Sequence, residues 1–282
     1  MPRQSRVELA GGIHHVTAKC PSGRILFHDD TDRRRYLRLV AREVRERHWG
    51  VFTFCLMTNH IHLLVHTPGP DLGAGIKRIH ESFARYINGR HELRGHLFGS
   101  RFYSGPVLTD RHFRGCLRYI ARNPVRHGAC QKPEDWPWSA HLALAGAVSP
   151  PSFLDVAGTH RYFADTPEQA RIGYLRLVAQ SDDDLLTELA RLQPDHWLLT
   201  AMQAYLFSVP QLADFLGTSV RTAHRRIANA RDGKGTVPFV SAEGGADRGA
   251  DGALVLGLLE VVHGRAAAAV GGDEELEVVR AR

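Results

Sequence analysis

Two histidines that flank a single apolar residue, His60 and His62, are well suited to binding a metal ion. The apolar run 63–65 that follows them is typical of a buried strand. Because successive side chains of a strand point to opposite faces, both imidazoles would project from one face while Ile61 points into the core. A chain with 17 histidines also contains close pairs by chance. The pair therefore indicates a metal site only if partners lie elsewhere in the chain.

A tyrosine and an asparagine could supply those partners. Tyr119 and Asn123 are four residues apart in a predicted helix, so they share one helix face. A helix packed near the histidines would bring the phenol to the metal and offer the Asn123 oxygen as a third ligand. Two imidazoles and an amide suit Mg²⁺ or Mn²⁺ and leave positions open for phosphate oxygens. Attack of the phenol on a phosphodiester would give a phosphotyrosine ester, which conserves the bond energy for rejoining. Tyr103 is the alternative nucleophile, but it lacks a polar partner four residues on.

Composition and charge indicate a partner rich in phosphate. The chain has 282 residues, of which 43% are hydrophobic and 23% charged, as in ordinary globular proteins. Residues 1–150 contain 23 Lys plus Arg against 12 Asp plus Glu, a net +11, whereas the remainder has 13 against 18, a net −5. Nucleic acid is the commonest large polyanion that such a basic half would bind.

Neither a membrane nor a disulfide framework is expected. No run reaches the roughly 18 to 20 apolar residues that span a bilayer, and the N-terminus lacks the apolar run of a secretory signal. We therefore expect a cytoplasmic protein. The four cysteines show no Cys-x-x-Cys spacing, which favours buried free thiols.

The elements that must position the histidines and Tyr119 form a recognisable order. Alternating and helical patterns predict the strand 13–19, the helix 32–48, the strands 51–57 and 60–67, the helix 72–88, a strand within 97–108 that includes 101–103, and the helix 110–123, ending before Pro124. Thr58 and Asn59 would join the middle strands in a tight hairpin. This order predicts an α+β fold with a ferredoxin-like split-βαβ antiparallel sheet, helices on one face and the other face free.

The second half of the chain has a different character. We predict a first domain over residues 1–145, a linker over 146–160, a mostly helical domain over 161–235, and a flexible tail over 236–282 with a candidate short helix. Residues 209–231 resemble a helix-turn-helix, in which Gly217 makes the turn and Ser219 caps the second helix. The basic residues expected to contact DNA on that helix are Arg221, Arg225 and Arg226. An ordinary helical hairpin is the alternative interpretation.

Four motifs in order carry a resemblance to a known family. They are Asn-His-Ile-His at 59–62, Leu-Phe-Gly-Ser-Arg-Phe-Tyr at 97–103, Tyr-Ile-Ala-Arg-Asn-Pro-Val-Arg at 119–126, and Pro-Glu-Asp-Trp-Pro-Trp-Ser at 133–139. Together they resemble the single-tyrosine transposases of the HUH endonuclease superfamily, and within it the REP-associated tyrosine transposases. The resemblance extends from about residue 11 to residue 145.

The resemblance implies a ferredoxin-like fold, a divalent metal at His60 and His62, a nucleophile at Tyr119, and Asn123 in the place of the residue that completes the metal site. It implies cleavage of single-stranded or hairpin DNA, with a 5′-phosphotyrosine and a free 3′-hydroxyl as products, by a monomer or a homodimer. We expect DNA phosphates to be held by Arg101, Arg122 and Arg126.

Two alternatives stay open on the sequence. The chain could be a non-catalytic DNA-binding regulator derived from a transposase, although its complete set of four site residues favours catalysis. An RNA-binding ferredoxin-like module would stack bases on aromatic side chains of the sheet, and the histidine pair in that place argues against it.

Overall fold

The computed structural model describes residues 9–193 and 196–232, and the predicted tail lies outside them. Its centre is a four-stranded antiparallel sheet in the order β2-β3-β1-β4. The strands are β1 (Gly12–Lys19), β2 (Gly50–Leu56), β3 (His60–Thr67) and β4 (Tyr103–Val107). Helix α1 (Asp30–Arg47) follows β1, α2 (Leu72–Arg90) follows β3, and α3 (Asp110–Arg126) follows β4. The predicted α+β fold and its split-βαβ order are confirmed.

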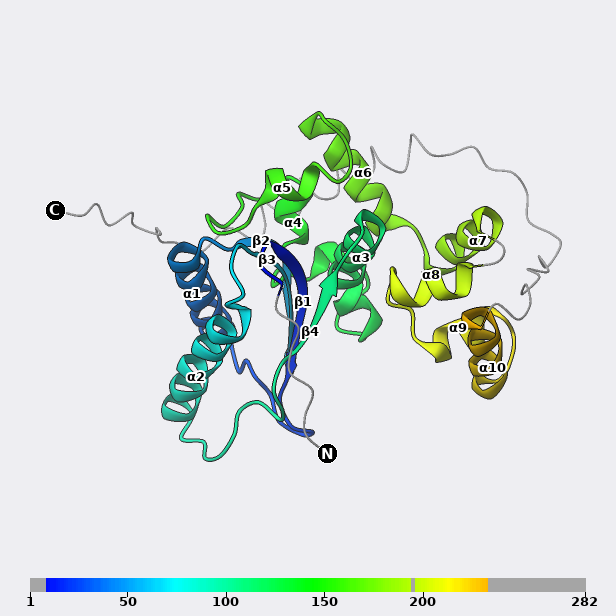
Figure 1. The fold of residues 1–282 in the computed structure, drawn as a ribbon. Coiled ribbons are helices and arrows are strands. Elements are labelled where there is room, and N and C mark those ends of the chain that lie inside the picture. Colours follow the sequence, from blue (N-terminus) through cyan, green and yellow to red (C-terminus); the bar gives the residue numbers. More distant parts are fainter. Residues whose placement is uncertain (1–8, 194–195, 233–282) are drawn as a thin grey trace.

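Helices lie on both sides of the sheet. Figure 1 shows α1 and α2 on one side and α3 on the other. Apolar residues at helical spacing explain the first layer, since Ile76, Ile79 and Phe83 of α2 are all fully buried. The face expected to be free of helices therefore carries α3, which is the helix needed near the histidines.

Helix α3 runs past the predicted boundary at Pro124 and ends at Arg126. The prediction of an end at residue 123 was wrong because a proline in the last turn loses only one backbone hydrogen bond there. The following amides close the helix instead, since His127 N–H donates to the Asn123 carbonyl oxygen and Ala129 N–H to that of Pro124. The longer helix extends the face of Tyr119 by one further turn.

Strand β4 begins later than expected. Pairing with β1 starts at Tyr103, opposite Thr17, so Arg101 and Phe102 precede the strand. The carbonyl oxygen of Lys19 accepts from Gly99 N–H, so the chain approaching β4 is tied to β1 by a separate contact. Phe102 is buried beside His80 of α2, with ring centroids 6.1 Å apart. The prediction that put residues 101–102 in the strand was therefore wrong.

The regular elements after α3 are all helices. They are a short 3₁₀ helix η1 (Pro133–Asp135) and the helices α4 (His141–Leu144), α5 (Val156–His160), α6 (Pro167–Ala179), α7 (Asp182–Leu192), α8 (Trp197–Gln203), α9 (Val209–Phe215) and α10 (Val220–Arg231) in the described residues. No helix in residues 9–193 or 196–232 is long and apolar enough to cross a membrane.

These helices pack in two separate hydrophobic cores. Buried residues of α6, including Tyr174 and Val178, share a core with the sheet. A second core, from Leu185 to Ile227, joins α7 to α10. We call residues 182–232 the helical extension. The division into domains at 145 and 160 stays a prediction, but residues of the predicted linker contact the sheet directly, since Asp155 N–H donates to the Val51 carbonyl oxygen.

Candidate active site

The tight hairpin between β2 and β3 places His60 and His62 on one face of the sheet. Met57 N–H donates to the His60 carbonyl oxygen, which closes the turn directly before β3. The two rings have centroids 5.1 Å apart and planes at 88°. His62 is buried, with 3% of its surface exposed, whereas His60 is half-buried. The strand geometry expected from the sequence therefore brings the two imidazoles together.

The nitrogens of His60 are oriented for a cation. Its Nδ1 lies 2.7 Å from the Asn59 side-chain oxygen, and its Nε2 lies 2.9 Å from the Asn123 oxygen. If the neutral His60 ring donates its Nδ1 proton to Asn59, its Nε2 carries a lone pair. That lone pair then faces the Asn123 oxygen, which is also an acceptor. A proton at Nε2 would relieve that contact, but burial lowers the pKa of His60, with smaller contributions from its neighbours. A divalent cation bound by both atoms would be compatible with this contact, and so would an Asn123 amide turned to donate its N–H to His60 Nε2.

The nitrogens of His62 support the same conclusion. His62 Nδ1 lies 3.1 Å from His15 Nε2 and 3.4 Å from the Thr17 hydroxyl, while His62 Nε2 is buried without a hydrogen bond in the described part of the chain. Burial lowers the pKa of His15 to about 4 and that of His62 well below its usual value. Both rings are therefore neutral, as a metal ligand must be. His15 fixes the orientation of the His62 ring, as supporting residues around metal sites do.

Asn123 is needed to complete a metal site. In residues 9–193 and 196–232, no group of three or more His, Cys, Asp or Glu side chains could hold a metal ion. The candidate set therefore consists of His60, His62 and the buried amide of Asn123. Two neutral imidazoles and an oxygen would leave positions open on Mn²⁺ or Mg²⁺ for the oxygen ligands that these ions prefer.

Tyr119 lies against these histidines. Its ring centroid is 5.4 Å from that of His62 and 5.9 Å from that of His15. Burial raises the pKa of Tyr119, while Arg126 and Asn123 act in the opposite direction. The phenol is therefore neutral at physiological pH. Tyr103, the alternative nucleophile, is 68% exposed on β4 and lies opposite Thr17 rather than against a histidine.

The arginines proposed to hold phosphates have different environments. Arg122 and Arg126 of α3 both contact Asp182 of the helical extension, together with Arg118. Arg101 is exposed in the segment before β4. Of the three arginines predicted to contact DNA on α10, Arg221 and Arg225 are exposed, whereas Arg226 is half-buried. Figure 1 shows α10 at the far side of the extension, away from the sheet.

His127 is a neighbour of the site that the sequence analysis missed. It lies at the end of α3, exposed, with its ring centroid 5.0 Å from that of His60. Its spacing of four residues from Asn123 is the signal that could have identified it. A pocket of about 470 Å³ is lined by His127, His60 and Asn59, among others. Of the three candidate metal ligands, His60 lines this pocket.

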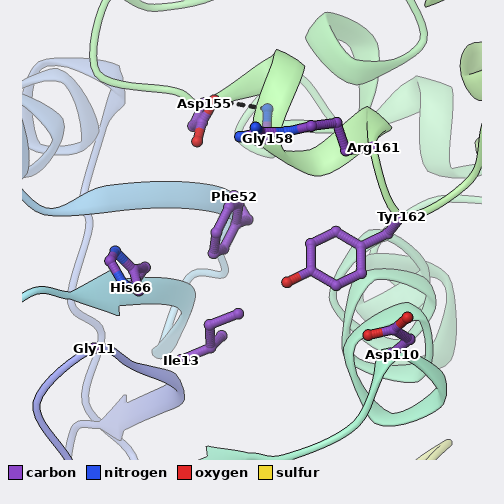
Figure 2. A pocket seen from close by; sticks show the side chains of 9 residues that line it. All are labelled: Gly11, Ile13, Phe52, His66, Asp110, Asp155, Gly158, Arg161 and Tyr162. Atoms are coloured by element: carbon purple, nitrogen blue, oxygen red, sulfur yellow. Dashed lines mark hydrogen bonds between the residues drawn. The ribbon is translucent and has the colours of Figure 1, made fainter. Parts of the chain in front are cut away.

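A larger pocket lies at the other end of β3. Its volume is about 570 Å³, and its lining includes His66, Asp110, Arg161 and Tyr162. Figure 2 shows the Tyr162 hydroxyl pointing into it, while Asp155 accepts from the Gly158 amide at 2.7 Å. None of the predicted site residues lines this pocket. Its size alone does not make it the catalytic centre.

Comparisons with known proteins agree with the motifs. Residues 12–123 match the family of IS200-like transposases. The chain is 27% identical over 108 residues to a Haemophilus influenzae protein assigned to the REP-associated tyrosine transposases, a match that covers 34% of this chain and 61% of that relative. A solved REP-associated tyrosine transposase bound to a REP hairpin aligns with 50% of this chain and 82% of its own, at 21% identity and a TM-score of 0.44. The family resemblance expected from the sequence is confirmed.

Proposed function

We propose that this chain, whose residues 12–123 carry the domain of the IS200-like transposases, nicks single-stranded DNA and transfers the strand through a bond to Tyr119. The observation that carries the proposal is the meeting of Tyr119 with His62, and of His60 with Asn123, on one face of the sheet. The four residues come from β3 and α3, and His60 and Asn123 are 63 positions apart in the chain. Packing of α3 onto β3 is what brings them together.

The reaction follows from the positions of the reacting groups. The Tyr119 oxygen attacks the scissile phosphorus and loses its proton to solvent, while the bond from phosphorus to the 3′-oxygen breaks and that oxygen is protonated. The products are a 5′-phosphotyrosine and a free 3′-hydroxyl. In strand transfer a 3′-hydroxyl attacks the phosphotyrosine and releases Tyr119. When bound by His60, His62 and Asn123, a Mg²⁺ or Mn²⁺ ion would polarise the scissile phosphate.

A single chain supplies the complete candidate site. Tyr119 lies against the histidines of its own chain, and this arrangement supports cleavage within one subunit. We therefore propose that cleavage takes place within one subunit, whether the protein is a monomer or a homodimer. A hairpin beside the cleaved strand is the proposed DNA partner, in line with the family resemblance.

The C-terminal helices favour a second role in DNA binding. Gly217 adopts a positive φ of 58° between α9 and α10, and the Ser219 side chain accepts from Thr222 N–H at the start of α10. Both features fit the predicted helix-turn-helix, and Arg221 and Arg225 are exposed on the second helix. We propose that α10 contacts DNA, which a non-catalytic regulator derived from a transposase would also do.

A covalent adduct distinguishes the two functions. The full-length protein is incubated with Mn²⁺ and a radiolabelled hairpin oligonucleotide with single-stranded flanks, and adducts are resolved on denaturing gels. We expect an adduct with the native protein and with Tyr103→Phe, and none with Tyr119→Phe. No adduct across hairpins of varied sequence, with DNA binding intact, would favour the regulator.

A further inference from the structure

Three arginines of α3 converge on one carboxylate of the helical extension. Arg118, Arg122 and Arg126 recur every four residues, so they form one stripe along the helix. Asp182, the first residue of α7, lies 2.6 Å from Arg118 Nη2 and 3.2 Å from Arg126 Nη2. Arg122 Nε is 3.8 Å from the same carboxylate. Asp182 thus connects the extension to the helix that carries the proposed nucleophile.

Arg126 lies close to two aromatic rings. Its guanidinium carbon is 5.2 Å from the ring centroid of Tyr119 and 5.2 Å from that of Phe207. Phe207 belongs to the core of the extension and is 3% exposed. The cation therefore lies close both to the ring of the proposed nucleophile and to a side chain held in the extension. An arginine on the outside of a helix would otherwise sample many rotamers.

We propose that Asp182 and Phe207 are positioning residues that hold Arg126 against Tyr119, so that the helical extension completes the proposed active site. This inference rests on the proposed function for its catalytic consequence, but not for its geometry. Arg126 stacked on the phenol restricts the ring to one orientation beside His62 and supplies a positive charge near the oxygen that attacks. Without the ion pair to Asp182, the guanidinium is free to leave the Tyr119 ring.

The charges argue against Asp182 as a mere substitute for a DNA phosphate. Three guanidinium groups face a single carboxylate, so the cluster keeps a net positive charge with the ion pair formed. The Arg122 guanidinium also donates to the Val178 carbonyl oxygen at 2.9 Å, and Arg118 to that of Gln180 at 2.8 Å. These contacts hold Arg118 and Arg122 in place independently of DNA. The three arginine side chains are at most 19% exposed, so Asp182 meets them in the packed interface between α3 and the extension.

The test compares Asp182→Asn with Asp183→Asn. Asp183 is exposed in the same first turn of α7, so its replacement removes the same charge from the same helix end without touching α3. The first readout is the ring resonance of Tyr119 in protein labelled with ¹³C-tyrosine, assigned through Tyr119→Phe. We expect Asp182→Asn to shift this resonance and Asp183→Asn to leave it in place. If Asp182→Asn unfolds the extension, Phe207→Leu tests the same stack from its other side and should shift the resonance too.

The second readout separates positioning from DNA binding. At saturating hairpin DNA and Mn²⁺, Asp182→Asn should lower the single-turnover rate of adduct formation by between about tenfold and about a hundredfold. Its DNA affinity should change by less than about threefold, and Asp182→Glu should recover part of the rate. Tighter DNA binding with an unchanged rate would overturn the proposal in favour of an inhibitory role.

The two proposals fail in different ways. A native protein that forms no adduct, but whose Tyr119 resonance responds to Asp182→Asn alone, would refute the proposed function and support the positioning by Asp182. If the Tyr119 resonance shifts in neither Asp182→Asn nor Phe207→Leu, and both variants are folded, the positioning role is refuted whatever the activity.

Discussion

Replacing Gly115 by alanine should lower the free energy of unfolding by about 2 kcal/mol, although alanine is normally the better residue inside a helix. Gly115 lies in the middle of α3, where the chain of the helical extension crosses at Ala204 and Tyr205. A Cβ at this position would overlap the Ala204 carbonyl oxygen and lie 2.6 Å from its carbonyl carbon and 2.9 Å from Tyr205 Cα. All three obstacles are backbone atoms, which cannot rotate away.

The magnitude follows from two opposed contributions. Carbon atoms in contact prefer separations of about 3.5 Å or more, so the extension must move by roughly 1 Å away from α3. Overpacking of this kind costs about 3 kcal/mol when the neighbour cannot adapt. Alanine in a helix interior stabilises the fold by about 1 kcal/mol relative to glycine. The net effect is a decrease of about 2 kcal/mol in the free energy of unfolding.

Gly89 provides the matched control. It lies near the end of α2, is exposed, and has no atom within 4 Å of a built Cβ. Gly89→Ala should therefore stabilise the protein by up to about 1 kcal/mol through helix propensity alone. Urea unfolding followed by circular dichroism measures both variants. If Gly115→Ala were as stable as the native chain, the close approach of the extension to α3 would be wrong, and with it the stack of Phe207 on Arg126.

Three further outcomes follow from the ion pairs and the candidate ligands. Burial raises the pKa of Asp182, but the neighbouring arginines lower it by more, so the carboxylate stabilises the fold. Asp182→Asn should therefore lower the free energy of unfolding by about 1 kcal/mol at pH 7, and by less as the pH falls below about 4 and the native carboxylate becomes protonated. Urea unfolding at several pH values measures this difference. Arg221→Ala with Arg225→Ala should weaken DNA binding and reduce its salt slope by about 2, as read by fluorescence anisotropy; an unchanged slope would exclude α10 from the DNA contact. Mn²⁺ should raise the melting temperature of the native protein but not of His60→Ala, and an equal rise in both would exclude His60 as a ligand.

The sequence was most informative where its pattern is local. Alternation in 60–67 and the four-residue spacing of Tyr119 and Asn123 each assign side chains to one face of one element. The order of strands and helices then left few topologies, and the split-βαβ sheet brings the two faces together. The errors at Pro124 and at residues 101–102 concern the ends of elements. Local hydrogen bonds after Pro124 set the end of α3, and contacts with β1 and α2 set the start of β4.

The contacts across the two cores could not be predicted. Asp182 is one of three consecutive acidic residues, and nothing in 182–184 indicates which of them meets α3. Its partners lie 56 and 64 residues away in the chain. Likewise His15 and His62 are 47 residues apart and become neighbours only through the pairing of β1 with β3. From the sequence alone, Gly115 is expected only to lower the stability of its helix. The structure shows that it lies against the backbone of the extension.

The most direct test of the account is to locate the covalent bond. The adduct formed with Mn²⁺ and a hairpin oligonucleotide is digested with nuclease and trypsin, and the peptide that carries the nucleotide is sequenced by mass spectrometry. Arginines at 118 and 122 delimit a peptide of residues 119–122 whose only tyrosine is Tyr119. We predict a 5′-linked nucleotide on this peptide, and a nucleotide on the peptide that contains Tyr103, or on none, would contradict the assignment of Tyr119 as the nucleophile.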